Sequence, residues 1–292
     1  MEFPRGHVAN NRFTQLRRTV TNHAATAVAA TLSALVVSTL VAIFAYLAIK
    51  GATSLNWSFL TQTPKPVGEV GGGMANALIG SVIILLIASV LGLPVGIGAG
   101  IYLAEYGQNP LGQAIRFTAD VLNGVPSIVI GLVAYGLVVY EQGHFSALAG
   151  GVALAIMMIP ILARTTEEML RLVPTAVREA AFGLGIPQWR TTVSITLASA
   201  RAGIITGIML AFARVAGETA PLLFTALGNQ FWNLSPNQPM AALPLQIYVY
   251  ANSPYEDWHR QAWAGALLLI IMIVGTTSIV RFVFRQRLGG AR

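Results

Sequence analysis

The chain has 292 residues, of which 55% are hydrophobic and only 10% are charged, and its formal net charge is +7. Because a typical soluble protein carries about 25% charged residues, this composition predicts an integral membrane protein and excludes an ordinary soluble domain. The chain contains no cysteine, which excludes disulfides and cysteine-based metal or redox chemistry. Its four histidines are far apart in the sequence, so we expect no metal site and no cofactor bound by this chain.

The apolar segments predict an all-α polytopic membrane protein with six transmembrane helices. A helix that crosses the membrane needs about 20 mainly apolar residues. Six segments reach that length, namely 24–49, 74–104, 121–140, 145–163, 202–226 and 261–280. The first is longer than the apolar core of a signal peptide, which is about 7–15 residues, so we expect an uncleaved anchor.

The positive charges predict the orientation of these helices. With the N-terminus in the cytoplasm, fourteen of the 18 Lys and Arg residues fall on the inner side, and the outer side holds Lys50, Lys65 and Arg260. Cytoplasmic connections of membrane proteins are enriched in Lys and Arg, so we expect a multi-pass protein with both termini in the cytoplasm. Topology thereby accounts for the net positive charge, and nucleic acid is not expected as a partner.

Two opposite charges interrupt the apolar segment 202–226. Arg214 and Glu218 are four residues apart, which is about one helical turn, so we expect their side chains to meet on one face. Ionisable groups within a membrane span are costly and usually face a pathway or a protein interior. Because a guanidinium grips a tetrahedral oxyanion with paired hydrogen bonds, the pair predicts an anion path. The alternative is an internal ion pair that only fixes helix packing.

Prolines predict irregular backbone in two of the spans. Pro221 lacks an N–H and clashes with the carbonyl of Gly217, so we expect a kink or break beside the charged pair. Irregular backbone at membrane depth is tolerated only where it is buried in protein or lines a cavity. Pro126, followed by Ser127, has the same effect in the segment 121–140, and the alternative for both prolines is a kink that serves packing.

The longest cytoplasmic connection, 164–201, contains an amphipathic pattern. We expect a short helix over residues 175–184, with Thr175 as its N-cap and with Gly185 and Pro187 ending it. Shape alone fits a helix that lies on the lipid headgroups and a helix that docks on a partner equally well.

The residues of this helix resemble the EAA motif of ABC importer permeases. The resemblance is carried by Glu179, Ala180, Ala181, Gly185, Ile195 and Leu197. In that family the motif forms a coupling helix that docks in a cleft of the ATP-binding subunit, so the resemblance implies ATPase coupling through residues 179–185. The chain departs from the motif at Ala198, where the family usually has proline.

Four further stretches resemble the PstA-type permease subunits of phosphate ABC importers. They are Asn-Gly-Val-Pro-Ser-Ile-Val-Ile-Gly at 123–131, Arg-Val-Ala-Gly-Glu-Thr-Ala-Pro at 214–221, Ala-Leu-Pro-Leu-Gln-Ile-Tyr at 242–248 and Trp-Ala-Gly-Ala at 263–266. The resemblance implies the type I permease fold of ABC importers. It also implies a phosphate path that includes Pro126, Ser127, Arg214, Glu218, Thr219 and Pro221.

The resemblance divides the chain into three parts. Residues 1–73 comprise a cytoplasmic segment, the first transmembrane helix and an outer loop. Residues 74–287 are the expected permease core, with the coupling helix near 175–187, and residues 288–292 form a short tail.

The same resemblance implies the partners and the location of the chain. They are a dimer of ATP-binding subunits, a second permease subunit of the PstC type and an extracytoplasmic phosphate-binding protein, at the inner membrane of a bacterium. No Gly-Lys-Ser/Thr triplet of a phosphate-binding loop occurs, so we expect ATP to bind another chain and this chain not to be an enzyme.

Other functions stay open beside this one. Within the importer class, the alternatives are the PstC-type subunit and a permease for sulfate or molybdate. A secondary anion carrier would need no ATPase, and the EAA-like helix argues against it. An intramembrane enzyme would need a nucleophile and base or a metal constellation, and none is visible in the sequence.

Small and charged residues near the second and third spans complete the predictions. Gly92, Gly96, Gly100 and Ala104 recur every four residues, which predicts that another helix approaches closely. Beyond this row, Glu105 and Arg116 are expected to be solvated loop charges, and Asp120 is expected to cap the third helix at its N-terminus.

Overall fold

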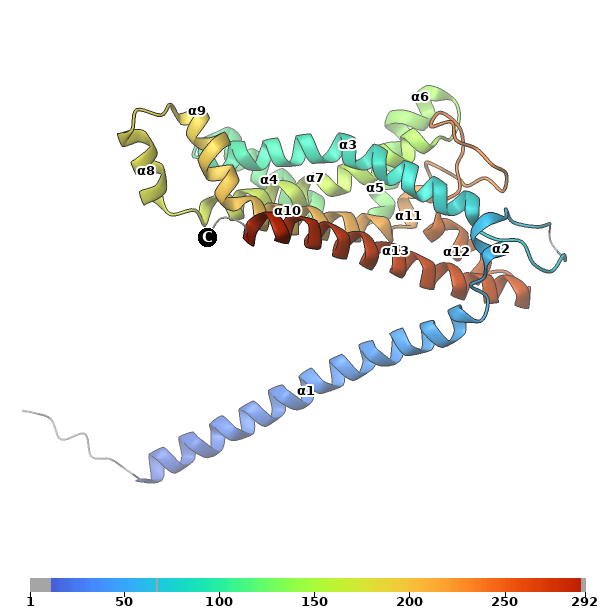
Figure 1. The fold of residues 1–292 in the computed structure, drawn as a ribbon, viewed down its shortest axis with the longest axis horizontal. Helices are drawn as coiled ribbons and strands as arrows, with labels where there is room; N and C mark the ends of the chain where they lie inside the picture. The colour runs from blue at the N-terminus through green and yellow to red at the C-terminus, as the bar shows by residue number, and fades with distance from the viewer. Residues whose placement is uncertain (1–11, 67, 290–292) are drawn as a thin grey trace, which may run out of the picture. The chain divides into compact units, whose positions relative to one another are not determined.

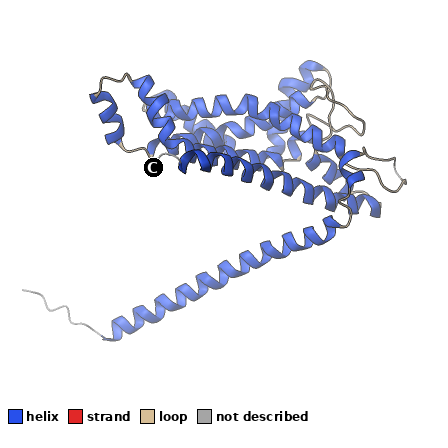
Figure 2. Ribbon diagram, viewed as in Figure 1, coloured by secondary structure: helices blue, strands red, loops and turns tan. Residues whose placement is uncertain are grey.

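The computed structural model describes residues 12–66 and 68–289, and within these ranges the regular structure is helical (Figure 2). In the same ranges, the only extended pairings are two isolated bridges, Pro64 with Gly72 and Leu227 with Met240. The prediction of an all-α protein is confirmed. Five of the described helices are long and apolar enough to cross a membrane, and there are six if one bent pair counts as a single span. Arg5 and Arg292, two of the positive charges counted on the predicted cytoplasmic side, lie outside the described residues.

The chain divides into two compact units, residues 1–49 and residues 50–292. The first unit contains most of α1 (Arg12–Ala52), a continuous helix of 41 residues. It includes the predicted span 24–49 and begins about three turns before residue 24. The helix extends this far because Arg17 and Arg18 are good helix formers although they are not apolar.

Four long helices of the second unit pack in series, and each contacts the next (Figure 1). They are α3 (Ala75–Glu105), α7 (Ala147–Arg171), α10 (Leu197–Ala216) and α13 (Glu256–Gly289). The central helix is α7, which packs against both α3 and α10 and is the most buried of the candidate spans. The core therefore lies along α7, and every other long helix of this unit keeps one face exposed.

The small residues of α3 lie against α7, as predicted. A Cβ atom at Gly96 would lie 2.6 Å from the Cβ of Leu162, and a Cβ at Gly100 would lie 2.5 Å from the Cβ of Thr166. The missing side chains therefore let the two helices approach more closely than larger residues would allow. Gly92 is buried in the same interface.

The third predicted span is bent sharply in the middle. Its parts are α4 (Pro110–Gly124), α5 (Ser127–Ala134), a π-turn (Tyr135–Val139) and α6 (Tyr140–Gln142). The two halves meet at an angle of 109°. Pro126 lies at the bend and restricts Val125 to an extended backbone with φ −71° and ψ 133°, so α4 ends there. The kink predicted at Pro126 is confirmed, and it is a full break.

The predicted start of this span at residue 121 is wrong. The helix begins at Pro110, and Asn109 caps it by accepting a hydrogen bond from the backbone N–H of Gly112 at 2.7 Å. Hydropathy misses this start because the first turns of α4 carry polar residues on an exposed face.

The fifth predicted span begins earlier in the chain and ends earlier than predicted. Helix α10 continues from α9 (Gln188–Thr191) and a π-turn (Thr192–Thr196), so one helical rod runs from Gln188 to Ala216. Polar residues and arginines at its beginning end the apolar segment in the sequence, but they do not end the helix.

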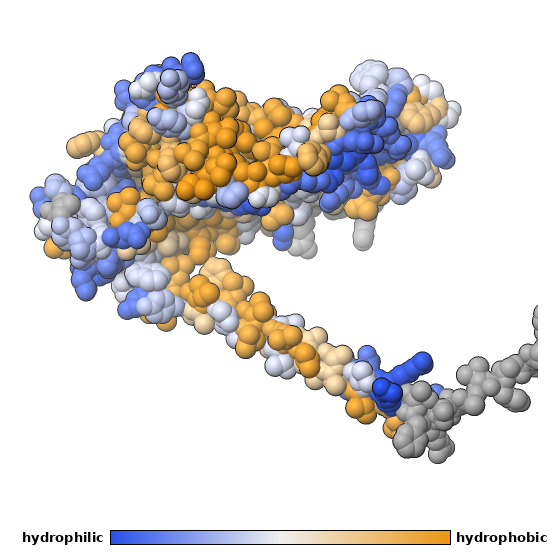
Figure 3. Space-filling view, turned by 180° about the vertical axis from the view of Figure 1, so that it is seen from behind, coloured by the Kyte–Doolittle hydropathy of each residue, from blue (hydrophilic) through white to orange (hydrophobic). Residues whose placement is uncertain are grey.

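Shorter helices lie at the two ends of the second unit. One end holds α2 (Trp57–Thr61) and α12 (Leu243–Ala251), and the other holds α8 (Thr175–Gly183) beside α9 (Figure 1). Helix α11 (Ala220–Leu223) follows the end of α10. Apolar residues cover the middle of the visible face of this unit, and hydrophilic residues gather toward its ends (Figure 3). This distribution is the one that a helix bundle in a bilayer requires.

Candidate functional site

The helix that carries Arg214 breaks directly after it. Helix α10 ends at Ala216, Gly217 forms its C-cap, and two non-helical residues precede α11, which starts at Ala220. The break arises because glycine readily ends a helix and Pro221 has no N–H to continue the hydrogen-bond ladder. The prediction of irregular backbone beside the charged pair is confirmed.

The predicted contact between Arg214 and Glu218 is wrong. No hydrogen bond or ion pair joins them, and within the described chain Arg214 has no polar partner. Glu218 lies beyond the end of α10, so the spacing of one helical turn does not align the two side chains. Arg214 occupies the last turn of the helix, where a cation is favoured by the helix dipole, and it is exposed, whereas Glu218 is half-buried.

Arg214 lies on an exposed stripe of α10. Thr206, Leu210 and Arg214 are all exposed and follow one another at intervals of four residues, and we call this stripe the open face of α10. The opposite side of the helix, with Ala211 and Val215, is buried in the core. Because an arginine in a membrane span is costly where it faces lipid, the open face has the chemistry of a path wall.

The two stretches 123–131 and 214–221 come together in space. Gly131 of α5 lies against Pro221 of α11, and a Cβ at Gly131 would be 2.7 Å from the Cα of Pro221. Pro221 is buried in this contact, so it positions α11 rather than presenting a surface. At the start of α5, Pro126 is exposed and Ser127 is half-buried.

The stretch 242–248 supports the break from the other side. The hydroxyl of Thr219 donates a long hydrogen bond of 3.5 Å to the carbonyl of Pro244. The backbone N–H of Leu243 donates to the Oγ of Ser81 on α3 at 2.7 Å. The start of α12 is therefore held between α3 and the break, which fixes the backbone around Glu218.

At the other end of the molecule, α8 confirms the predicted amphipathic helix. Its N-cap is Pro174 and not Thr175, because the chain enters the helix in the extended conformation that proline favours. Gly185 ends the helix, as predicted, with φ +76° in the left-handed region. The N–H of Ile186 then donates to the carbonyl of Ala181 at 3.1 Å, which is the hydrogen bond of a Schellman motif.

Most of α8 is exposed. Ala181 is its buried residue, and Glu179 and Ala180 are exposed. Phe182 and Leu184 are 48% and 81% exposed, so the end of the helix presents apolar side chains that nothing in the described chain covers. Exposed apolar residues of this kind mark a contact surface.

Ion pairs at this end of the molecule were missed by the sequence predictions. Glu105 is not a solvated loop charge, because its side chain is 7% exposed and accepts a hydrogen bond from Arg178 Nη1 at 2.7 Å. Arg116 is not solvated either, because its Nε donates to Oε1 of the buried Glu167 at 2.7 Å.

Asp120 does not cap a helix. It lies inside α4 and pairs with Arg164 of α7, whose Nη2 is 2.6 Å from Oδ2 of Asp120. The Asp120–Arg164, Arg116–Glu167 and Glu105–Arg178 pairs span 44, 51 and 73 residues of sequence. No local pattern signals pairs of that separation, although three carboxylates near the inner ends of spans were a clue to arginine partners.

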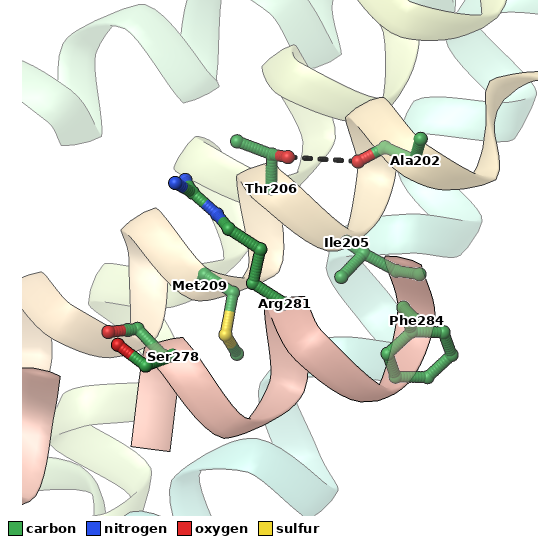
Figure 4. Close-up of a pocket in the computed structure, with 8 residues that line it drawn as sticks. Ala202, Ile205, Thr206, Met209, Ser278, Arg281 and Phe284 are labelled. Carbon is green, nitrogen blue, oxygen red and sulfur yellow. Dashed lines mark hydrogen bonds between the residues drawn. The ribbon is translucent and has the colours of Figure 1, made fainter. Parts of the chain in front are cut away.

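A groove of about 360 Å³ lies between α10 and α13 (Figure 4). Arg281 brings one positive charge to it. The hydroxyl of Thr206 already donates to the carbonyl of Ala202 at 2.9 Å, and that of Thr277 donates to the carbonyl of Ile273 at 2.8 Å. Both hydroxyl protons are thus committed to the helices, and the groove offers an anion the guanidinium of Arg281 and the hydroxyl of Ser278.

Comparison with known proteins places this geometry in a family context. Residues 96–288 match the family described as binding-protein-dependent transport system inner membrane component. The phosphate transport system permease protein PstA of Yersinia pestis is 48% identical over 239 residues, which are 82% of this chain and 81% of that protein. PstA of Pasteurella multocida (strain Pm70) is 50% identical over 240 residues, covering 82% and 85%. PstA of Mycobacterium leprae (strain TN) is 40% identical over 229 residues, covering 77% and 75%.

Solved structures share the fold. A chain of the MetNI methionine ABC transporter in an inward-facing conformation aligns with a TM-score of 0.58 at 15% identity, covering 75% of this chain and 96% of that chain. A chain of an amino acid ABC transporter solved with histidines aligns with a TM-score of 0.56 at 18% identity, covering 73% and 93%. The predicted fold of an ABC importer permease is therefore confirmed.

Proposed function

Because this chain belongs to the family of binding-protein-dependent transport system inner membrane components, we propose that it is the PstA-type permease subunit of an ATP-driven phosphate importer. The observation that carries the proposal is Arg214, an exposed arginine without a polar partner in the described chain, at a helix break inside a multi-pass membrane protein. The relatives named PstA support a phosphate permease over one for sulfate or molybdate, and a PstA-type over a PstC-type subunit.

In this proposal, Arg214 binds the passing phosphate. Its planar guanidinium donates paired hydrogen bonds to two phosphate oxygens. The five N–H groups have no competing acceptor in the described chain, so this chain contributes no anion that the phosphate must displace. Ser127, at the start of α5, contributes a hydroxyl to the same wall. Thr219 holds the break through its long hydrogen bond to Pro244, and Pro126 and Pro221 shape the backbone of the wall.

We assign Glu218 a part in release and selectivity. Its carboxylate lies in the same backbone break and accepts a hydrogen bond from a protonated phosphate oxygen. Sulfate carries no proton at neutral pH, so the same carboxylate repels it. A negative group in the break that follows the helix of Arg214 also limits affinity for an anion, which a path requires because it must release what it binds.

The partners follow from the surfaces that the chain leaves exposed. A second permease subunit of the PstC type would cover the open face of α10 and complete the path. A dimer of ATP-binding subunits would dock on α8 through Glu179, Ala180 and the apolar Phe182, with Gly185 shaping the end of the helix. A phosphate-binding protein would dock at the outer end, and both termini would lie in the cytoplasm.

This chain would supply neither an ATP site nor a bound cofactor, and hydrolysis would take place on the partner ATPase. The EAA-like helix α8 favours this arrangement over a secondary carrier, which has no ATPase to dock.

The test is reconstitution of the chain with the ATPase, the second permease and the binding protein in lipid vesicles. We expect binding protein loaded with phosphate to stimulate ATP hydrolysis and phosphate uptake, and equimolar sulfate to stimulate neither. Equal stimulation by sulfate would contradict the assigned substrate, and uptake without the ATPase would favour a secondary carrier.

A further inference from the structure

The coupling helix α8 has few packing contacts with the membrane core. In the described chain, the elements that it contacts most are α9 and the following π-turn, which are its own continuation toward α10. Ala181 is the buried residue of the helix. Packing therefore joins α8 to α9 and the π-turn, and the short link 172–174 joins it to the end of α7. Attachment to α3 is left to other interactions.

One side chain of α8 supplies that attachment. Arg178 Nη1 donates to Oε1 of Glu105, the last residue of α3, at 2.7 Å. Its Nη2 donates to the backbone carbonyl of Leu170, in the last turn of α7, at 2.9 Å. A single guanidinium thus joins α8 to the inner ends of two membrane helices, and its side chain is only 20% exposed.

The position of Glu105 favours a cation beside it, and the carbonyl of Leu170 has room for a second donor. Glu105 lies at the C-terminus of α3, where the helix dipole disfavours a negative charge, and its side chain is 7% exposed. The carbonyl of Leu170, in the last turn of α7, accepts a hydrogen bond from the N–H of Val173 at 3.2 Å and has a second lone pair for Arg178. Arg178 satisfies both groups at once, which a lysine with its single nitrogen does less well.

We propose that Arg178 is a positioning residue that ties the coupling helix to α3 and α7, so that movement of α8 reaches the core through this guanidinium as well as through the chain. This rests on the proposed function, because α8 moves only if an ATPase docks on it. Because α3 and α7 pack closely at Gly96 and Gly100, a movement that reaches them through Arg178 shifts the two helices together. The covalent route delivers it to α7 through residues 172–174, and through α9 to α10 and Arg214.

The tie is tested in the reconstituted importer with Arg178→Gln, measuring phosphate taken up per ATP hydrolysed. We expect the complex to assemble and to hydrolyse ATP, while uptake per ATP falls about fivefold or more, the lower end of typical coupling between sites. The matched control is Arg171→Gln, because Arg171 also forms a 2.7 Å ion pair but with Glu167 of its own helix. We expect the control to keep the ratio of the unmodified chain.

A charge exchange separates the tie from a general structural role. Arg178→Glu and Glu105→Arg, each alone, place like charges together and should lower the ratio at least as much as Arg178→Gln. The double variant restores the attraction to α3, although not the bond to Leu170, so it should recover part of the ratio. A purely structural role would instead lower assembly, ATP hydrolysis and uptake together.

Three results would overturn the proposal: an unchanged ratio in Arg178→Gln, a double variant no better than either single variant in complexes assembled to the same yield, or assembly, ATP hydrolysis and uptake that fall together in Arg178→Gln. Failure of the unmodified complex to take up phosphate would speak against the proposed function instead, so the two failures are distinguishable.

Discussion

Gly131 of α5 and Pro221 of α11 lie so close that a Cβ at position 131 would sit 2.7 Å from the proline Cα. These two residues belong to stretches that are 83 residues apart, from Gly131 to Arg214. Together they set the distance between α5 and α11, beside the helix break that follows Arg214. The wall of the proposed path therefore depends on a residue that has no side chain.

Replacing Gly131 with alanine should disturb this contact. The added methyl group meets backbone, which cannot rotate away, so we expect a loss of about 1–3 kcal/mol of stability, as for overpacking elsewhere. Thermal unfolding of the purified chain in detergent measures the loss. Gly136→Ala is the matched control, because a Cβ there meets nothing within 4 Å. Equal unfolding temperatures for the two variants would contradict the close contact.

Arg214→Gln should lower phosphate uptake by about tenfold or more, because a charged hydrogen-bond donor to the anion is lost without a change in packing. Arg214→Lys should keep part of the activity, since it retains the charge but not the paired geometry. Uptake by vesicles that contain equal amounts of complex measures both. Arg281→Gln, at the exposed groove between α10 and α13, is the control and should stay near the unmodified rate. Unimpaired uptake by Arg214→Gln would remove Arg214 from the path.

Glu167→Gln should destabilise the inner end of the bundle strongly. The Glu167 side chain is 3% exposed and lies 2.7 Å from Arg116 and from Arg171, with Arg164 at 3.6 Å. Removing its charge leaves Arg116 and Arg171 without their shared anion, whereas Arg164 keeps Asp120, and breaking a buried pair costs about 3–5 kcal/mol.

The neighbouring Glu168 provides the control for that experiment, because it is exposed on the same turn of α7. Glu168→Gln should change stability by no more than about 0.5 kcal/mol. If both variants unfold at the same temperature, Glu167 does not hold the arginines together.

Gly185→Ala should weaken the end of the coupling helix. The φ of Gly185 is +76°, and a residue with a Cβ adopts this region at a cost of about 1–2 kcal/mol. We expect α8 to lose its defined end and the chain to retain less ATPase on co-purification. Gly183→Ala, in the same helix with no atom within 4 Å of the new Cβ, should retain as much as the unmodified chain. Equal retention by both variants would show that docking does not depend on this turn.

The sequence predicted those features that depend on neighbours in the chain. The apolar segments located every long helix, the spacing of Gly96 and Gly100 predicted the α3–α7 interface, and Gly185 marked the end of α8. Pro126 and Pro221 marked the two breaks, because proline disrupts a helix through its own ring and needs no distant partner.

Features that depend on distant residues were missed. The spacing of Arg214 and Glu218 predicts a pair only if the helix continues through both residues. Gly217 lies between them and Pro221 follows, and the helix ends before it reaches Glu218. Glu105 looked like a loop charge because its partner, Arg178, is 73 residues away. An ion pair of that separation is set by how the helices pack, which hydropathy and local spacing do not describe.

The helical rod from Gln188 to Ala216 has a mechanical consequence. Its 29 residues make it about 43 Å long at 1.5 Å per residue, with the coupling region at one end and Arg214 near the other. A tilt of about 5° at the inner end would carry the far end by about 4 Å, which exceeds the length of a hydrogen bond. Only the π-turn at Thr192–Thr196 interrupts the α-helical geometry of the rod. If Arg214 binds the anion as proposed, a tilt of the rod that is small enough to leave helix packing intact would be large enough to make or break its hydrogen bonds to that anion.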